Sequence, residues 1–158
     1  MRTTDDTIDR DDPFDLSRFT RAQQGIYDSV LAELRSGRKR THWMWFIFPQ
    51  IAGLGHSPMS QHYAIKSSKE ARQYLKHPVL GARLLECAEA VLAVEGRSVS
   101  DIFGYPDDMK LMSSMTLFAA VEDNPNSVFV QVVEKYFQGK QDHRTLQLLE
   151  SPGGQQRK

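Results

Sequence analysis

The chain has little cysteine, no long apolar run and no excess of charge of either sign. Its one cysteine, Cys87, has no partner for an internal disulfide and cannot build a thiolate metal cluster. The longest unbroken apolar run, residues 43–48, is far shorter than the roughly 20 residues that cross a bilayer. The 20 Lys and Arg residues balance 20 Asp and Glu residues, which argues against binding duplex DNA or an anionic membrane by bulk charge.

What is present is typical of one soluble domain. The 158 residues are near the usual size of a single domain, and 40% of them are hydrophobic. The charged N-terminus has no signal-peptide core, so a cytoplasmic protein is expected. Residues 1–13 are expected to be a disordered leader, residues 14–150 one globular domain and residues 151–158 a disordered tail.

Apolar residues recur at helical spacing through most of the chain and predict about six helices. Asp15 is the expected N-cap of the first helix, and Ser67 and Glu70 have the spacing of a capping box for the next. The later helices are expected to begin near Pro78, Pro106, Val128 and Asp142. The predicted fold class is mainly α, in a single compact domain.

One segment departs from helical periodicity. Residues 42–48 are apolar on both alternating faces and end at Pro49, as a buried strand would. A strand needs a hydrogen-bonding partner, because buried backbone groups are costly to leave unpaired. The nearest candidate partner is residues 61–66, so a small β-hairpin or extended insertion is expected near residues 42–66.

The first candidate site is this aromatic segment with the loop behind it. Trp43 and Trp45 share a face of an extended chain and can line a pocket that stacks on a nucleobase or nicotinamide. Gly53 and Gly55 allow the backbone to approach a ligand, although no third glycine completes the dinucleotide fingerprint. The simpler interpretation is that the aromatic rings form part of the core.

A second polar cluster lies in the fourth expected helix. Lys110, Ser113 and Thr116 are spaced by three, so one helix face can present an ammonium and two hydroxyls. Lys110 can hold a phosphate, and Asp107 or Asp108 can act as a general base or stabilise a developing cation. The simpler interpretation is that the acidic residues cap the helix and that the hydroxyls bond to the preceding turn.

Other polar residues give weaker signals. His62 and Tyr63 form a candidate hydrogen-bonding pair, although adjacent residues of an extended chain face opposite ways. The histidines have no spacing typical of zinc ligands, so no metal and no cofactor are predicted. The basic run at residues 35–40 follows a helix end, where the dipole favours cations; a solvated helix end is favoured, with phosphate capture as the alternative.

Three blocks of the sequence, in this order, resemble a known family. They are WMWFIFPQ at 43–50 with GLG at 53–55, YLKHPVLGARL at 74–84 and FGYPDDMKLMSSMTLF at 103–118. Together they are similar to the uncharacterised bacterial family numbered eighteen-ten among the domains of unknown function, whose members are often labelled calpastatin in error. The resemblance covers about residues 14–149. It implies a compact, largely helical fold and brings no established activity.

A weaker similarity points to a chemistry. Ser60-Gln61-His62-Tyr63 is similar to the Ser-Glu-His-Tyr region of NADAR proteins, which are linked to NAD and ADP-ribose chemistry and cleave N-glycosidic bonds. Gln61 stands where that family has a glutamate, and an amide cannot accept a proton or offer a full negative charge to an oxocarbenium-like transition state. Either Asp107 or Asp108 supplies the carboxylate, or this chain binds without hydrolysing.

The leading hypothesis is therefore a small domain that binds a nucleotide or ADP-ribose-type ligand and hydrolyses an N-glycosidic bond. Its expected catalytic residues are Asp107 and Asp108, and its expected ligand-binding residues are Trp43, Trp45, Gln50, Gly53, Gly55, Ser57, Tyr63, Lys110, Ser113 and Thr116. One shared cavity should hold a tryptophan, part of the 53–57 loop and Asp107 or Lys110. The alternatives are a non-catalytic protein-interaction module with an aromatic groove, and a domain in which these residues are only core and caps.

Overall fold

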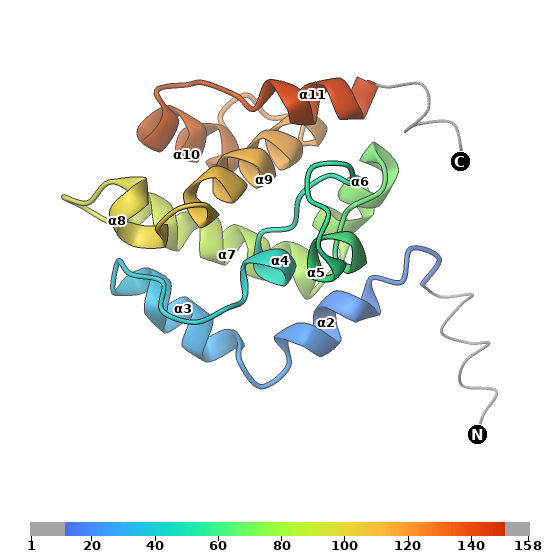
Figure 1. Cartoon of the computed structure of the whole chain (residues 1–158), viewed down its shortest axis with the longest axis horizontal. Helices are drawn as coiled ribbons and strands as arrows, with labels where there is room; N and C mark the ends of the chain where they lie inside the picture. The colour runs from blue at the N-terminus through green and yellow to red at the C-terminus, as the bar shows by residue number, and fades with distance from the viewer. Residues whose placement is uncertain (1–11, 151–158) are drawn as a thin grey trace.

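The computed structural model describes residues 12–150, and this range contains ten helices and no strand (Figure 1). The helices are α2 (Ser17–Gln23), α3 (Tyr27–Arg35), α4 (Met44–Ile47), α5 (Pro58–His62), α6 (Ser68–Lys76), α7 (Leu80–Ala93), α8 (Val99–Phe103), α9 (Asp107–Val121), α10 (Val128–Phe137) and α11 (His143–Glu150). The mainly α class is confirmed, with more and shorter helices than the six expected. The expected tail, 151–158, and the expected leader, apart from residues 12 and 13, lie outside the described residues.

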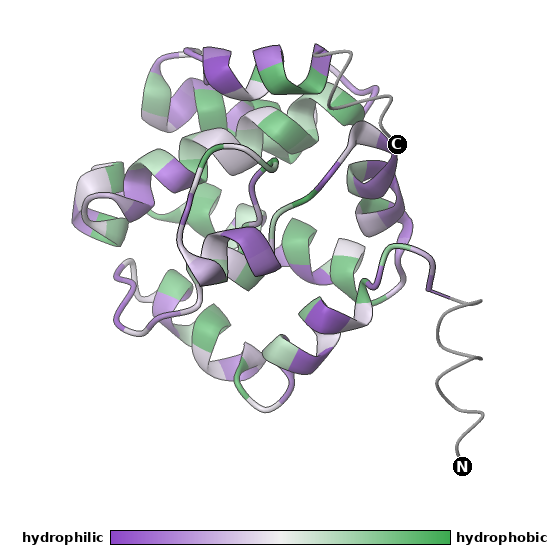
Figure 2. Cartoon of the chain, turned by 45° about the vertical axis from the view of Figure 1, so that its right-hand side comes forward, coloured by the Kyte–Doolittle hydropathy of each residue, from purple (hydrophilic) through white to green (hydrophobic). Residues whose placement is uncertain are grey.

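The centre of the fold is α9, which packs against α6, α8, α10 and α11. Phe118 on α9 contacts both Tyr74 and Phe129, with ring centroids 5.5 and 5.8 Å apart. In Figure 1, α9, α10 and α11 form the upper part of the molecule, α2 and α3 form the lower part, and α7 lies between them. Most of the helices carry both hydrophobic and hydrophilic residues (Figure 2), as expected for helices with one buried face. Each helix within 12–150 is too short or too polar to span a bilayer.

The β-hairpin prediction is wrong, because the aromatic segment forms the single helical turn α4. The turn and its flanking residues are apolar because most of them lie in the core: Trp43, Met44, Phe46, Ile47 and Phe48 are at most 8% exposed, and Trp45 is partly buried. Periodicity alone cannot distinguish such a buried turn from a buried strand. In the described part of the chain, β pairing is limited to one isolated parallel bridge between Ile51 and Ile65.

Side chains from α2 satisfy buried backbone carbonyls of the irregular segment around α4 and α5. The Gln23 amide donates to the Phe46 carbonyl at 2.8 Å. The Arg18 guanidinium donates to the carbonyls of His62 and Ala64, each at 2.8 Å, and pairs with the Glu70 carboxylate at 2.8 Å. Because Arg18 and Glu70 are both buried, this ion pair and its hydrogen bonds must be complete for the segment to be stable.

One of the two predicted helix caps is observed in the structure. The predicted cap at Ser67 is confirmed, since its hydroxyl accepts from the Glu70 N–H at 3.1 Å. Asp15, in contrast, is not a cap: it has a φ of 54° in the left-handed region. The carboxylate of Asp12 instead accepts from the backbone N–H groups of Leu16 and Ser17, at 2.7 and 2.9 Å. The N-cap position is Leu16, which has no side-chain cap, and the carboxylate that binds the first N–H groups lies three residues before the predicted one.

Replacing Arg18 with Met should reduce the free energy of unfolding by about 3–5 kcal/mol, because it leaves the Glu70 carboxylate buried without its cation. Urea denaturation followed by circular dichroism measures the change. The matched control is Arg21→Met on the exposed side of the same helix, which should change stability by about 0.5 kcal/mol or less. If the Arg18 variant is as stable as this control, Arg18 does not neutralise the buried Glu70 carboxylate as described.

Candidate functional site

Four of the predicted site residues meet where α4 lies beside the N-terminal end of α9. The Lys110 ammonium lies 5.1 Å from the ring centroid of Trp45 and 3.6 Å from Asp107 Oδ1. Asp107 Oδ2 lies 2.9 Å from the ammonium of Lys39, which in turn lies 4.9 Å from the Trp43 ring centroid. Each lysine thus contacts one aromatic face, and the two share one carboxylate. These five residues are called the tryptophan–lysine cluster.

The cluster uses its carboxylate to join two parts of the chain. The side chain of Lys39 is only 7% exposed, and its ammonium also donates to the Thr41 carbonyl at 2.6 Å. Both oxygens of Asp107 face an ammonium, which leaves this carboxylate poorly placed to receive a substrate proton. The prediction that the basic run 35–40 is a solvated helix end is therefore wrong for Lys39. The run itself was visible in the sequence, but the burial of one of its members was not.

Glu33 holds the loop that leads from α3 to Trp43. Its carboxylate accepts from the backbone N–H groups of Arg40 and Thr41, at 2.8 and 3.1 Å, and from the Thr41 hydroxyl at 2.7 Å. It also accepts from the Trp43 indole N–H at 2.9 Å. Burial by itself would raise the pKa of Glu33, but these hydrogen bonds to the charged form outweigh it and hold the pKa below its usual range. Trp43 is only 1% exposed, so its ring is part of the core.

The other polar residues predicted on α9 bind protein groups. Asp108 accepts from the Ser100 hydroxyl at 2.9 Å and so joins α8 to α9. The Ser113 hydroxyl donates to the Asp142 carboxylate at 2.8 Å, and the Thr116 hydroxyl accepts from the Asp142 N–H at 2.9 Å. Asp142 directly precedes α11, so these two hydroxyls dock that helix. These contacts differ from the simpler interpretation, because α9 has no side-chain N-cap and the two hydroxyls bind Asp142, although Ser113 also donates to the preceding turn at Met109.

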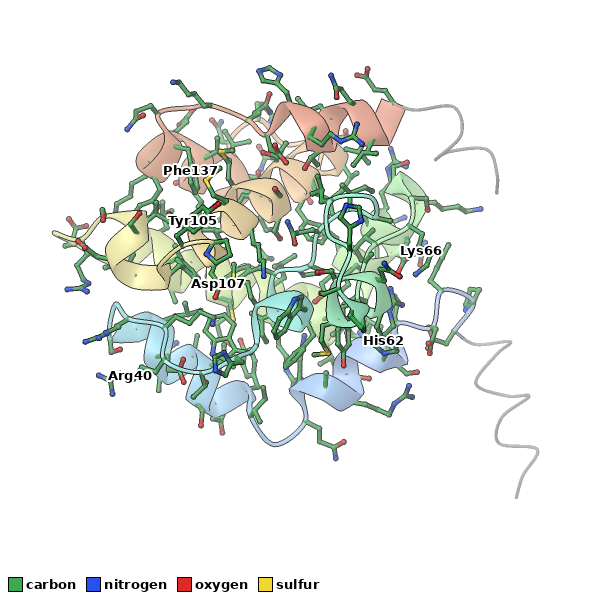
Figure 3. The ribbon with its side chains drawn as sticks, in the orientation of Figure 1. Arg40, His62, Lys66, Tyr105, Asp107 and Phe137 are labelled. Carbon is green, nitrogen blue, oxygen red and sulfur yellow. The ribbon has the colours of Figure 1, made fainter. Side chains whose placement is uncertain are left out.

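The glycine loop lines a pocket of about 320 Å³. Its lining residues are Gln50, Ile51, Ala52, Gly53, Gly55, Ser60, Gln61, Ala64 and Lys66. This glycine-loop pocket contains three of the predicted ligand-binding residues and adds Ser60, Gln61 and Lys66. The sequence offered a signal for Ser60 and Gln61 in the Ser-Gln-His-Tyr motif, but none for Lys66. Figure 3 shows Lys66 and His62 on the α5 side of the molecule, away from Asp107.

Both glycines are required by the shape of this loop. Gly53 has a φ of +105°, and a Cβ there would lie 3.1 Å from Leu148 of α11. A Cβ at Gly55 would lie 2.5 Å from the Ser60 hydroxyl. The predicted Ser57 caps α5 by accepting from the Ser60 N–H at 3.1 Å. The loop is thus packed between α5 and α11.

Several hydrogen-bonding groups around the pocket are available. Within residues 12–150, the backbone N–H groups of residues 53–55 have no acceptor. The Lys66 ammonium has one long contact, 3.4 Å to the Ala64 carbonyl. The Gln61 amide nitrogen donates to the His56 carbonyl at 2.9 Å, which leaves its oxygen as a free acceptor. These groups can bind a ligand, and in the described chain the only protein contact that would have to break is the long one between Lys66 and the Ala64 carbonyl.

Cys87 belongs to the core, and the partly buried Tyr63 packs against it. The Tyr63 ring lies 5.7 Å from Phe19, 5.3 Å from Phe46 and 4.5 Å from the ring of His62. Burial raises the pKa of the Cys87 thiol to about 12, so this thiol is not a nucleophile near neutral pH. In the described part of the chain, His, Cys, Asp and Glu form no group of three that can hold a metal ion.

The predicted site residues are therefore divided between two places. Trp43, Trp45, Asp107 and Lys110 lie in the tryptophan–lysine cluster, whereas Gln50, Gly53 and Gly55 line the glycine-loop pocket. The cluster is occupied by its own ion pairs. The pocket has free donors and acceptors, and it is the stronger candidate for a ligand site.

Comparison with known proteins gives a family and a solved relative. A family model described as "Protein of unknown function (DUF1810)" matches residues 13–149. The crystal structure of the conserved hypothetical protein Rv1873 from Mycobacterium tuberculosis is 56% identical in sequence, with a TM-score of 0.86. The match covers 89% of this chain and 99% of that one. A search of curated proteins gave no match.

Replacing Glu33 with Gln should lower stability near neutral pH and much less in acid. The folded-state pKa of Glu33 lies below its usual value of 4.5, so the carboxylate stabilises the fold fully above that pH. This contribution is lost as the pH falls through the lower, folded-state pKa. The measurement is the difference in unfolding free energy between the wild type and the variant, from about pH 7 to about pH 3. A difference that stays constant with pH would contradict the assigned role.

Replacing Asp107 with Asn should cost about 1–3 kcal/mol of stability, because the mostly buried Lys39 ammonium loses its carboxylate. Lys110→Met is the matched comparison and should cost about 1 kcal/mol or less, since its ammonium is more exposed and its ion pair is longer. Denaturant midpoints of the two variants check this order. An Asp107→Asn protein that is as stable as the wild type would show that the carboxylate does not hold Lys39 in place.

Proposed function

This chain belongs to the DUF1810 family of unknown function, and we propose that its glycine-loop pocket binds a small anionic ligand of the nucleotide or ADP-ribose type. The proposal rests on the positive charge of the pocket lining. Its lining contains one formally charged residue, the cation Lys66, together with Gly53 and Gly55, whose backbone N–H groups have no acceptor in the described chain.

These groups favour a phosphate or a similar anion. A lysine ammonium forms charge-assisted hydrogen bonds with phosphate oxygens, and successive backbone N–H groups in a loop form concave anion sites. Gly53 and Gly55 let the backbone lie close to Leu148 and Ser60, which occupy the space that a Cβ would need. A side chain at Gly53 or Gly55 would clash with Leu148 or Ser60 and would change the shape of the loop.

We propose binding at this pocket, with N-glycosidic hydrolysis as the activity to be assayed there. The similarity to NADAR proteins favours hydrolysis, but it requires a carboxylate. The pocket lining contains none, and the predicted carboxylates are engaged elsewhere: Asp107 by Lys39 and Lys110, and Asp108 by Ser100. An assay for release of base from NAD and nucleosides separates binding from hydrolysis.

A protein-interaction module is the second candidate, on a different surface from the one predicted. The rings of the aromatic segment are mostly buried and do not form an open groove. Two large apolar side chains are exposed at the α8–α9 corner, Tyr105 at 83% and Met109 at 47%. This surface favours an interaction role, although it is much smaller than a typical protein interface.

Thermal unfolding with ADP-ribose, AMP and NAD at millimolar concentration tests the proposed function. A ligand present at 100 times its dissociation constant adds about 2.7 kcal/mol, which raises the melting temperature by several degrees. Lys66→Gln should lose this rise while keeping the melting temperature of the free protein. The matched control is Lys69→Gln, because Lys69 is exposed and lies outside the pocket lining; this variant should keep the ligand-induced rise. No rise with any ligand, or an equal rise with Lys66→Gln, would contradict the proposal.

A further inference from the structure

We infer that the glycine-loop pocket recognises a sugar phosphate through its phosphate and hydroxyl groups, and that an attached nucleobase adds nothing to binding. This inference rests on the proposed function and narrows its ligand class. It follows from the chemistry of the lining residues, from the orientation of one amide and from the size of the pocket.

The pocket offers no surface on which a base can stack. Its lining contains aliphatic, glycine, serine, glutamine and lysine residues, and none of them is aromatic. Proteins that bind bases without reading their edges do so by stacking them on aromatic rings. Two rings that flank this segment are engaged, since Phe46 and Tyr63 pack on each other and His62 packs on Tyr63. We therefore expect a base attached to the ligand to gain no stacking contact from the pocket lining.

The polar groups of the lining match hydroxyl groups. The hydrogen bond from Gln61 to the His56 carbonyl orients the Gln61 amide so that its oxygen is the free acceptor. The side chain of Gln50 makes no hydrogen bond with any residue of the range 12–150, so it can both donate and accept. Sugar hydroxyls also donate and accept, so the two carboxamides can bind neighbouring hydroxyls while Lys66 and the 53–55 loop bind the phosphate.

The size of the pocket agrees with a small ligand. About 320 Å³ lies at the lower end of the range of roughly 300–1,000 Å³ for sites that bury drug-sized molecules. A phosphorylated pentose fits this volume, whereas a whole dinucleotide or ADP-ribose would leave one half outside. We therefore expect the sugar phosphate moiety to account for the affinity of larger ligands.

Isothermal titration of the full chain with ribose 5-phosphate, AMP, adenosine, ribose and inorganic phosphate tests the inference. Ribose 5-phosphate and AMP should bind with dissociation constants within about threefold of each other, and adenosine should not bind, because the phosphate is required. AMP binding about tenfold or more tighter than ribose 5-phosphate would overturn the inference and leave the proposed function intact. Inorganic phosphate binding as tightly as ribose 5-phosphate would also overturn it. If no phosphate compound binds, the proposed function itself fails.

Gln61→Glu gives an independent test with a closely matched control. A carboxylate at this position would repel the phosphate and should weaken ribose 5-phosphate binding by about tenfold or more. Gln131→Glu is the control, because the Gln131 amide also donates to a backbone carbonyl five residues earlier, at 2.9 Å, outside the pocket lining. Its binding should equal that of the wild type, and both variants should keep the wild-type melting temperature. Undiminished binding by Gln61→Glu would overturn the inference.

Discussion

The structure depends on one requirement: buried backbone N–H and C=O groups outside regular secondary structure must find hydrogen-bond partners. Between the end of α3 and the start of α6 the chain contains only two short helices, yet much of it is buried. A buried carbonyl or N–H group without a partner costs about 1–3 kcal/mol, so this segment needs partners from elsewhere. Three side chains of the first two helices supply them: Arg18, Gln23 and Glu33.

This constraint explains why the chemically suggestive residues separate into two groups. Glu33 holds the first half of the segment to α3 through hydrogen bonds, and Asp107 of α9 holds it through the ion pair with Lys39. Arg18 and Glu70 hold the second half, where the backbone of residues 62–66 turns beside the glycine loop. In this second half the Gln61 amide oxygen and the Lys66 ammonium have no strong protein partner among residues 12–150, and both residues line the glycine-loop pocket.

The sequence predicted the helical class and several helix ends because these depend on local spacing and caps. Ser67 caps α6 as expected, and the loop containing Gly53 and Gly55 does line a pocket. The strand prediction failed because a helical turn that is buried on most of its sides has the same apolar pattern as a buried strand. Lys39 and Lys66 were missed because their roles depend on residues distant in the sequence, Asp107 for one and the 50–55 segment for the other.

The central claim is that a phosphate-bearing ligand binds at the glycine loop and not at the tryptophan–lysine cluster. Backbone amide resonances measured by NMR during a titration with ribose 5-phosphate test it most directly. The account predicts saturable shifts for the amides of Gly53, Leu54 and Gly55, with unchanged amides at the start of α9 and an unchanged Trp45 indole. Shifts concentrated at Asp107, Lys110 and Trp45, with none in the glycine loop, would contradict it.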